Sequence, residues 1–299
     1  MLVTGATGLV GRRLVAALLR DGAAVRALSR NPDRSGLDAR VEALAWNGRK
    51  APVDALAGAG AVVHLAGEPV FGGLLTPARR RRIRTSRIDS TRSIAAGLEA
   101  LPPSDRPAVL VCASAVGYYG SRGDAVLDES AAPGSGFLAK VCVDWEAAAA
   151  EVASSGVRSV SLRTGIVFAR EGGALPAMTL PFRFGLGGRI GDGRQWIPWI
   201  HVDDLVRLVQ ACLASEAYRG PLNAVAPEPV TNAQLTRALG RQLHRPTLLP
   251  VPAFALRLAL GDLAVELLGS RRAVPRRALE AGFAFEYAAV DAALHAELG

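Results

Sequence analysis

Cysteine and histidine are scarce in this chain of 299 residues, and their scarcity argues against two kinds of cross-linked site. The three cysteines, Cys112, Cys142 and Cys212, show no metal-ligand spacing, and an odd number does not form a closed disulfide framework. The four histidines are too scattered to suggest a metal site. The sequence therefore predicts no metal centre and a reducing, cytoplasmic environment.

Long apolar runs are missing as well. No stretch reaches the length of a transmembrane helix, and the N-terminus does not show the basic-then-apolar pattern of a secretory signal. The chain starts almost inside its first predicted strand, which leaves little room for a targeting segment. We therefore expect a soluble protein without a membrane partner, long enough to bury the core of one α/β domain with a second lobe.

Lysine is nearly absent: Lys50 and Lys140 are the only two, and 33 arginines supply the remaining basic charge. A net charge of +8 would permit nucleic-acid binding. However, abundant arginine and alanine are typical of the coding bias of a GC-rich genome. The one dense arginine cluster, at 78–87, has no interleaved aromatics and lies on a helical pattern. A solvated helix face with one or two phosphate-directed arginines is the better interpretation, so nucleic acid is not an expected partner.

The segment LVTGATGLVG, at 2–11, is the most informative motif. Its β-prone residues lead into three spaced glycines, and a helical apolar pattern follows, as at the start of a dinucleotide-binding βαβ unit. There Gly5 takes the tight turn, Gly8 lets the backbone approach a pyrophosphate, and Gly11 lets the helix pack on the sheet. Free N–H groups at the helix start face the anion. The predicted cofactor contacts in this motif are Gly5, Thr7, Gly8, Leu9 and Val10.

Strand and helix patterns alternate through most of the chain, which predicts an α/β fold with a doubly wound parallel sheet of the Rossmann type. From Gly172 to Ile200, glycine, proline and aromatic residues suit a loop region that shapes a pocket. We expect a Rossmann domain at 1–226, with a pocket-forming insertion at about 169–200, and a mostly helical substrate-side lobe at 227–299. The predicted elements are helices at 9–20, 77–100 and 138–154, and strands at 24–29, 41–46, 61–67, 108–114 and 159–168.

The end of the second predicted strand distinguishes NAD from NADP. An NAD site places an acidic residue there, about 20 residues after the glycines, to bind the ribose 2′-hydroxyl. This chain has Ser29, Arg30 and Asn31 instead, and the first carboxylate is Asp33. An arginine fork matches a 2′-phosphate, and a serine hydroxyl adds a donor. Ser29 and Arg30 therefore predict NADP(H); the alternative is that Arg30 is one of many surface arginines.

The chain resembles an extended short-chain dehydrogenase/reductase in the segments VTGATGLVG, HLAGEP, ASAVGYYG, RTGIVF and WIHVDD. The resemblance narrows to a sugar-epimerase-like subgroup, whose C-terminal segment is a domain of unknown function. The segments that carry this narrower resemblance are SRNP, LAGEP, GYYG, PFRFGLGGRIGDGRQWIPWIHVDD and the tail PVPAFALRLALGD…EAGFAF. Essentially the whole chain is covered. The resemblance implies a Rossmann core, bound NADP(H) and a substrate cleft between the core and the C-terminal lobe, and it does not identify a substrate.

The resemblance also implies a catalytic serine, a tyrosine and a lysine four residues after that tyrosine. The tyrosine transfers the proton, the lysine lowers the tyrosine pKa, and the serine orients the substrate oxygen. Ser114 matches the serine and Lys140 is the candidate lysine, but Gly136 stands where the tyrosine belongs. We expect Tyr118 or Tyr119, in the loop after Ser114, to substitute. The alternatives are that these tyrosines are packing residues and that Lys140 is a solvated helix residue.

Further candidate cofactor contacts follow the ends of predicted strands, where this fold binds its ligands. Glu68 lies at the carboxyl edge of the sheet, and Arg87 belongs to a Ser-Arg pair that matches the subgroup. Arg87 could reach a cofactor phosphate; the alternative is membership in the solvated arginine cluster. The full set is Leu65, Ala66, Gly67, Glu68, Arg87, Thr164, Gly165 and Val167.

Other residues suggest substrate contact or a structural role. In the loop-rich segment, arginine with tryptophan suits an anionic or sugar-like substrate, although tryptophan is more often a core residue. His64 lies within an apolar strand and is interpreted as a satisfied core residue, and Asp203 or Asp204 is expected to cap a helix. The substrate-side candidates are Arg183, Arg194, Trp196 and Trp199.

Two functions follow from these residues. The first is an NADP(H)-dependent oxidoreductase or epimerase of the extended short-chain type, acting on a small polar carbonyl, hydroxyl or sugar-like compound. The second is a non-catalytic NADP(H)-binding sensor or assembly protein, and a link of some family members to cell or plastid division fits that alternative. A third hypothesis, a basic protein associated with nucleic acid, has the least support.

Overall fold

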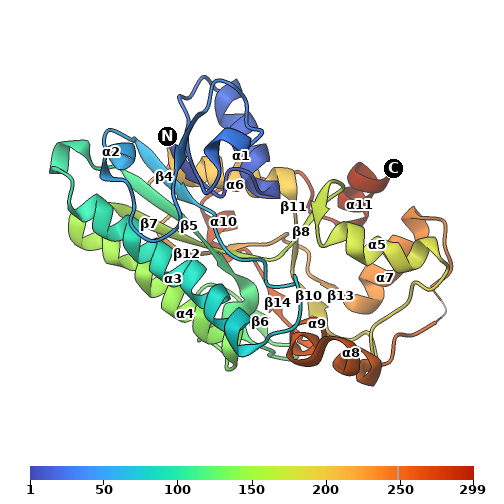
Figure 1. Cartoon of the computed structure of the whole chain (residues 1–299). Coiled ribbons are helices and arrows are strands. Elements are labelled where there is room, and N and C mark those ends of the chain that lie inside the picture. Colours follow the sequence, from blue (N-terminus) through green and yellow to red (C-terminus); the bar gives the residue numbers. More distant parts are fainter. Residues whose placement is uncertain (248) are drawn as a thin grey trace.

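Seven parallel strands form the central sheet of the protein. The computed structural model describes residues 1–247 and 249–299 (Figure 1). The strand order is β12-β7-β5-β4-β1-β2-β3, and every neighbouring pair is parallel. This confirms the predicted doubly wound sheet. The strands are β1 (Leu2–Thr4), β2 (Arg26–Ser29), β3 (Glu42–Ala45), β4 (Ala61–His64), β5 (Val109–Ala115), β7 (Arg158–Thr164) and β12 (Gly220–Ala224).

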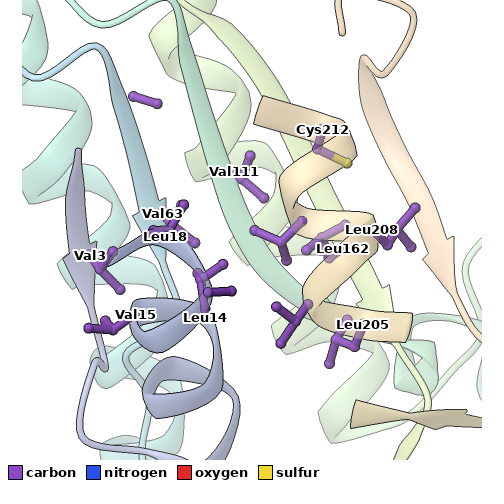
Figure 2. Close-up of a cluster of buried hydrophobic side chains, with 14 of the residues drawn as sticks. Val3, Leu14, Val15, Leu18, Val63, Val111, Leu162, Leu205, Leu208 and Cys212 are labelled. Atoms are coloured by element: carbon purple, nitrogen blue, oxygen red, sulfur yellow. The ribbon is translucent and has the colours of Figure 1, made fainter. Parts of the chain in front are cut away.

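Helices cover both faces of this sheet. On one face lie α1 (Leu9–Arg20) and α6 (Val202–Ala214), whose apolar sides pack on strand residues such as Val63 and Val111 (Figure 2). The opposite face is covered by α2 (Val53–Leu56), α3 (Pro77–Glu99) and α4 (Phe137–Ala150). Because both faces are covered, strands such as β4 are buried throughout, as their continuous apolar sequence predicts.

His64 is the polar exception in β4 and is fully buried. Its Nδ1 lies 2.6 Å from Oγ1 of Thr4 and its Nε2 lies 3.1 Å from Oγ of Ser90. Burial lowers the pKa of His64 to about 3, so the ring is neutral at physiological pH. The interpretation of His64 as a satisfied core residue is confirmed.

The strand predicted at 159–168 is wrong, because two strands occupy this segment. After β7 the chain leaves the central sheet, and β8 (Ile166–Ala169) pairs with β11 (Trp199–His201) and β9 (Gly172–Gly173). The segment that accepts the backbone hydrogen bonds changes directly after Gly165. The N–H of Gly165 donates to Ala224 beside β7, whereas the next N–H, of Ile166, donates to Pro198. The apolar pattern continues across this break and therefore does not show it.

The segment predicted as loop from Gly172 to Ile200 contains a helix, α5 (Leu175–Arg183), and a short strand, β10 (Trp196–Ile197). Leu175, Thr179 and Phe182 are the buried residues of α5, at the spacing of one helix face. Proline near the start of the helix and within it, with glycines on both sides, concealed this periodicity.

The predicted cap of α6 is also wrong. The N-cap residue is His201, whose Nδ1 accepts a hydrogen bond from the N–H of Asp203 at 3.2 Å. Asp204 is instead fully buried, where its carboxylate accepts from the N–H groups of Glu286 and Tyr287 at 2.9 and 2.8 Å. The carboxylate of Asp204 thus anchors the C-terminal segment to α6.

The segment after β12 is mostly helical, as expected (Figure 1). Together with α5 and β8 it builds an apolar cluster separate from those on the central sheet. Phe168, Trp199, Leu235 and Leu294 lie in this cluster. Ala278, however, packs into the core of the central sheet, and the division at 226/227 stays a prediction. Within the described residues, no helix is long and apolar enough to cross a membrane. The elements of this segment are β13 (Val230–Thr231), α7 (Asn232–Gln242), α8 (Ala253–Leu260), α9 (Ala264–Leu268), β14 (Arg272–Ala273), α10 (Arg276–Glu280) and α11 (Val290–Leu298).

The remaining elements are short. They are the strand β6 (Val126–Leu127), which pairs with β14, and the 3₁₀ helices η1 (Pro32–Arg34), η2 (Pro103–Asp105), η3 (Val116–Tyr119), η4 (Glu151–Ser155) and η5 (Gly261–Leu263).

Candidate functional site

The turn from β1 into α1 has the geometry of a pyrophosphate-binding loop. Gly5 has φ +69°, and a Cβ on it would lie 2.8 Å from the carbonyl carbon of Leu65. A Cβ on Gly11 would lie 2.2 Å from the carbonyl oxygen of Gly5. The N-cap residue of α1 is Gly8, which has no side chain to accept from the first N–H groups of the helix. Those N–H groups and the positive end of the helix dipole therefore suit an anion.

The order of the strands places this loop at the ligand crevice of the fold. All strands point the same way, but their order in the sheet reverses: from β1 it proceeds through β2 to β3 at one edge, and from β4 it proceeds through β5 and β7 to β12 at the other. Ligands of such sheets bind where the order reverses, at the carboxyl ends of the strands, which here means β1 and β4. The glycine loop follows β1, and Leu65 follows β4.

A cavity of about 340 Å³ opens at this crevice. Nine predicted site residues line it, and they come from the glycine loop, α3 and the ends of three strands. The structure therefore brings together residues that are far apart in sequence. They are Gly5, Gly8, Leu9, Val10, Leu65, Gly67, Arg87, Ser114 and Thr164.

The predicted 2′-phosphate residues lie outside this cavity, at the end of β2. Arg30 is exposed, and the Oγ of Ser29 accepts a hydrogen bond from the N–H of Asn31 at 3.2 Å. Strand β2 is the neighbour of β1, so these residues flank the glycine loop on the side away from β4. The remaining predicted cofactor residues outside the cavity wall are Thr7, Ala66, Glu68, Gly165 and Val167.

Arg87 is half-buried and forms part of the cavity wall. Its Nη1 donates to the carbonyl oxygens of Glu68 and Ile83 at 2.9 and 3.2 Å, and its guanidinium carbon lies 5.1 Å from the centre of the Trp145 ring. Burial lowers the pKa of Arg87. An arginine held against the cavity in this way fits the predicted contact with a cofactor phosphate.

Ser114 belongs to a polar network that sequence reasoning missed. Its Oγ donates to Oε1 of Glu146 at 2.7 Å. Arg163 binds the same carboxylate with two hydrogen bonds, from Nε at 2.9 Å and from Nη2 at 2.8 Å. Burial by itself lowers the pKa of Arg163, but the hydrogen bonds and charge of Glu146 raise it overall. The ion pair is nearly closed to solvent, with side-chain exposures of 3% for Arg163 and 14% for Glu146.

The expected catalytic role does not hold for Tyr119. This ring is fully buried, and its hydroxyl donates to Oδ1 of Asn223 at 2.7 Å and accepts from Nη1 of Arg163 at 2.9 Å. Burial raises the pKa of Tyr119 to about 12. Tyr118 packs edge-on against Tyr119, with its ring 3.5 Å from the guanidinium carbon of Arg163. Both tyrosines thus support the Arg163 side of the network, and neither lines the cavity.

Lys140 is exposed on α4 and does not line the cavity. The face of α4 that does so presents Leu138, Val141, Cys142 and Trp145. Leu138 and Cys142 are four residues apart, which is the spacing of the tyrosine and lysine in the superfamily. An aliphatic side chain and a thiol therefore face the cavity at that spacing. Burial raises the pKa of the Cys142 thiol to about 12, so it is protonated at neutral pH.

The substrate-side candidates are dispersed over the surface and a core. Trp199 is buried and stacks on Phe168 with ring centres 5.3 Å apart, so it is a core residue. Trp196 donates from Nε1 to Asp124 at 2.9 Å, and Arg183 and Arg194 are exposed. The structure does not bring these four side chains to the wall of the cavity beside Ser114.

The parallel sheet, the glycine loop and the cavity at its switch point define a dinucleotide-binding protein of the Rossmann type. A model of the NAD-dependent epimerase/dehydratase family matches residues 1–223, and a domain of unknown function, DUF1731, matches residues 251–297. The chain belongs to this epimerase/dehydratase family.

Similar proteins extend over the whole chain. It is 40% identical to the chloroplastic epimerase family protein SDR39U1 homolog of Arabidopsis thaliana, over 98% of this chain and 85% of that protein. The crystal structure of human epimerase family protein SDR39U1 with NADPH is 32% identical, with a TM-score of 0.87 over 99% of this chain and 98% of that chain. UDP-glucuronic acid 4-epimerase of Bacillus cereus, solved with UDP-glucuronic acid and NAD, has a TM-score of 0.79. At 16% identity, over 99% and 97% of the two chains, it shows the fold alone.

Proposed function

We propose that the chain binds NADP(H), with the pyrophosphate at the start of α1 and the nicotinamide half in the cavity beside Ser114. The observation that carries the choice of NADP over NAD is the end of β2, where Ser29 and the exposed Arg30 replace a carboxylate. The NADPH bound by the human relative supports this choice. The cytoplasmic location proposed from cysteine usage is consistent with three free, buried cysteines.

Calorimetric titration of the protein and of Arg30→Ala with NADPH and NADH tests the proposal. Loss of a charge-assisted hydrogen bond costs roughly 1.5–3 kcal/mol, so Arg30→Ala should bind NADPH about ten-fold or more weakly and NADH almost unchanged. Arg20→Ala, at the other end of α1, is the control and should bind both cofactors as the unmodified protein does. Equal affinity of the unmodified protein for NADPH and NADH would contradict the proposal.

We further propose that the family chemistry, oxidoreduction or epimerisation of a small polar or sugar-like compound, takes place beside Ser114. A bound nicotinamide supplies or accepts a hydride there. The chain contributes the Ser114 hydroxyl, held by Glu146, and no tyrosine–lysine pair from the α4 face. The proton is then exchanged with water, or it passes through the Ser114 hydroxyl to the carboxylate of Glu146. The nucleotide sugars bound by structural neighbours support the proposed substrate class only through the shared fold.

The second candidate is a protein that holds NADP(H) without turnover, and the pair Leu138 and Cys142 on the cavity face of α4 favours it. NADPH oxidation measured across a panel of carbonyl compounds and nucleotide sugars separates the two functions. Turnover that falls about 10²-fold in Ser114→Ala, with NADPH affinity retained, supports the enzyme. Tight NADPH binding with no oxidation across the panel supports the sensor.

A further inference from the structure

Arg12 ties the glycine loop to the segment that follows β2. It comes directly after Gly11, and its Nε donates to the carbonyl oxygen of Thr7 at 3.0 Å. From the same guanidinium, Nη1 donates to the carbonyl of Gly36 at 3.0 Å and Nη2 to that of Ser35 at 3.1 Å. Ser35 and Gly36 lie five and six residues after Arg30. Arg12 thus links the glycine loop to the segment that follows the predicted 2′-phosphate residues.

The charge of Arg12 is uncompensated. Its three partners are neutral carbonyl groups, and no carboxylate among the described residues forms an ion pair with it. The next residue, Arg13, is the opposite case, because its guanidinium pairs with Glu171 at 2.6 Å and with Asp203 at 3.2 Å. Two consecutive arginines on one helix therefore differ in whether their charge is available to a ligand.

The place of Arg12 suits a phosphate group. A second cavity, of about 440 Å³, is lined by Thr7, Leu9, Arg12 and Arg13, and Leu9 also lines the cavity beside Ser114. Glu171 lines it too, and its carboxylate is paired with Arg13. A guanidinium has five N–H donors, of which the three carbonyls take three. Two donors remain on a group whose orientation is already held, so little side-chain entropy is lost when a ligand binds.

We propose that Arg12 is a specificity-determining residue for the 2′-phosphate of NADP(H). It supplies positive charge and the two remaining N–H groups to the phosphate, and it holds the segment that follows Arg30 against the glycine loop. This role rests on the proposed function as an NADP(H)-binding protein. It adds a second arginine, from α1, to the one predicted at the end of β2.

Two nucleotides that differ only in the 2′-phosphate test this role: adenosine 2′,5′-bisphosphate and adenosine 5′-monophosphate. Neither carries a nicotinamide, so the cavity beside Ser114 does not affect the comparison. In Arg12→Ala we expect the dissociation constant of the bisphosphate to rise about ten-fold or more, and that of the monophosphate to stay unchanged. Arg20→Ala, at the other end of α1 and outside both cavities, is the control and should change neither constant. A rise in ionic strength should reduce the difference in bisphosphate affinity between the unmodified protein and Arg12→Ala, because salt screens the charge of the arginine.

Thermal unfolding of each variant checks that the loop still folds. If Arg12→Ala is unfolded, Arg12→Gln keeps hydrogen-bond donors without the charge, and the same loss of bisphosphate affinity is expected. Unchanged bisphosphate binding in the folded variant, or equal weakening of both nucleotides, overturns the role of Arg12. An unmodified protein that binds both nucleotides equally overturns the proposed preference for NADP(H) itself.

Discussion

The Oγ of Ser114 donates a 2.7 Å hydrogen bond to Oε1 of Glu146, a carboxylate that also pairs with Arg163 inside the protein. A serine hydroxyl has one hydrogen to donate, and Ser114 donates it away from the cavity. What remains for a bound molecule are the lone pairs of Oγ. In this state Ser114 suits a substrate hydroxyl that donates to it better than a carbonyl oxygen that needs a donor.

The pair formed by Glu146 and Arg163 should contribute strongly to stability. Glu146→Ala leaves a buried guanidinium without its partner, which costs about 3–5 kcal/mol in the free energy of unfolding. Glu151→Ala is the matched control, because the ion pair of Glu151 with Arg92 is half-exposed and contributes at most about 1 kcal/mol. Urea unfolding of the two variants measures the difference. Equal losses of stability in both would show that the buried pair is not the stronger one.

Removing the hydroxyl of Tyr119 should affect stability and leave cofactor binding unchanged. In Tyr119→Phe, Oδ1 of Asn223 loses its buried donor, at a cost of about 1–3 kcal/mol. The dissociation constant of NADPH should equal that of the unmodified protein, because Tyr119 does not line the cavity. Unfolding curves and calorimetric titration measure the two effects. A variant of native stability that binds NADPH weakly would instead place this hydroxyl at the cofactor.

The glycine loop and the sheet were predictable because local sequence determines them. Glycines at three-residue intervals mark positions where the backbone itself leaves no room, and continuous apolar runs mark strands covered on both faces. Seven of the nine predicted residues that meet in the cavity follow from these patterns, since strand ends and the glycine loop converge at the switch point of the sheet. Arg87 and Ser114 were instead predicted from the family resemblance.

The helix α4 was harder to interpret, because spacing alone does not show which face of a helix meets a cavity. Lys140 has the expected residue type, but it points to solvent, and Leu138 and Cys142 face the cavity. The partnership of Glu146 with Arg163 joins a helix to a strand, and no periodicity encodes it. One signal was present: a charged residue within the apolar strand at 158–164 requires a buried partner.

The fully buried His64 should make stability depend on pH in a defined window. Its pKa is about 3 in the folded protein and near 6.5 in an unfolded chain, so the unfolded state binds the extra proton between these values. His64 therefore contributes no pH dependence above pH 6.5, and below it the folded state loses about 1.4 kcal/mol per pH unit. His64→Gln should remove this component. Parallel curves of unfolding free energy against pH for the two proteins would contradict the assignment.

The third glycine of the loop should not tolerate a methyl group. In Gly11→Ala the new Cβ would lie 2.2 Å from the carbonyl oxygen of Gly5, so the loop must shift and NADPH affinity should fall at least ten-fold. Gly60→Ala is the control, since its Cβ would have no heavy atom within 4 Å. Calorimetric titration of the two variants with NADPH measures their dissociation constants. Retained affinity in Gly11→Ala would mean that the loop does not hold the cofactor.

A crystal structure of the NADPH complex tests the central claim most directly, namely that the cofactor occupies this cavity without a tyrosine–lysine pair. The account predicts the pyrophosphate at the N–H groups that begin α1 and the 2′-phosphate at Arg30. It also predicts the nicotinamide ring against Leu138 and Cys142, with the Tyr119 hydroxyl still bound to Asn223. A hydroxyl of Tyr118 or Tyr119 within about 3 Å of the reacting groups, or the Lys140 amine on the nicotinamide ribose, would contradict it.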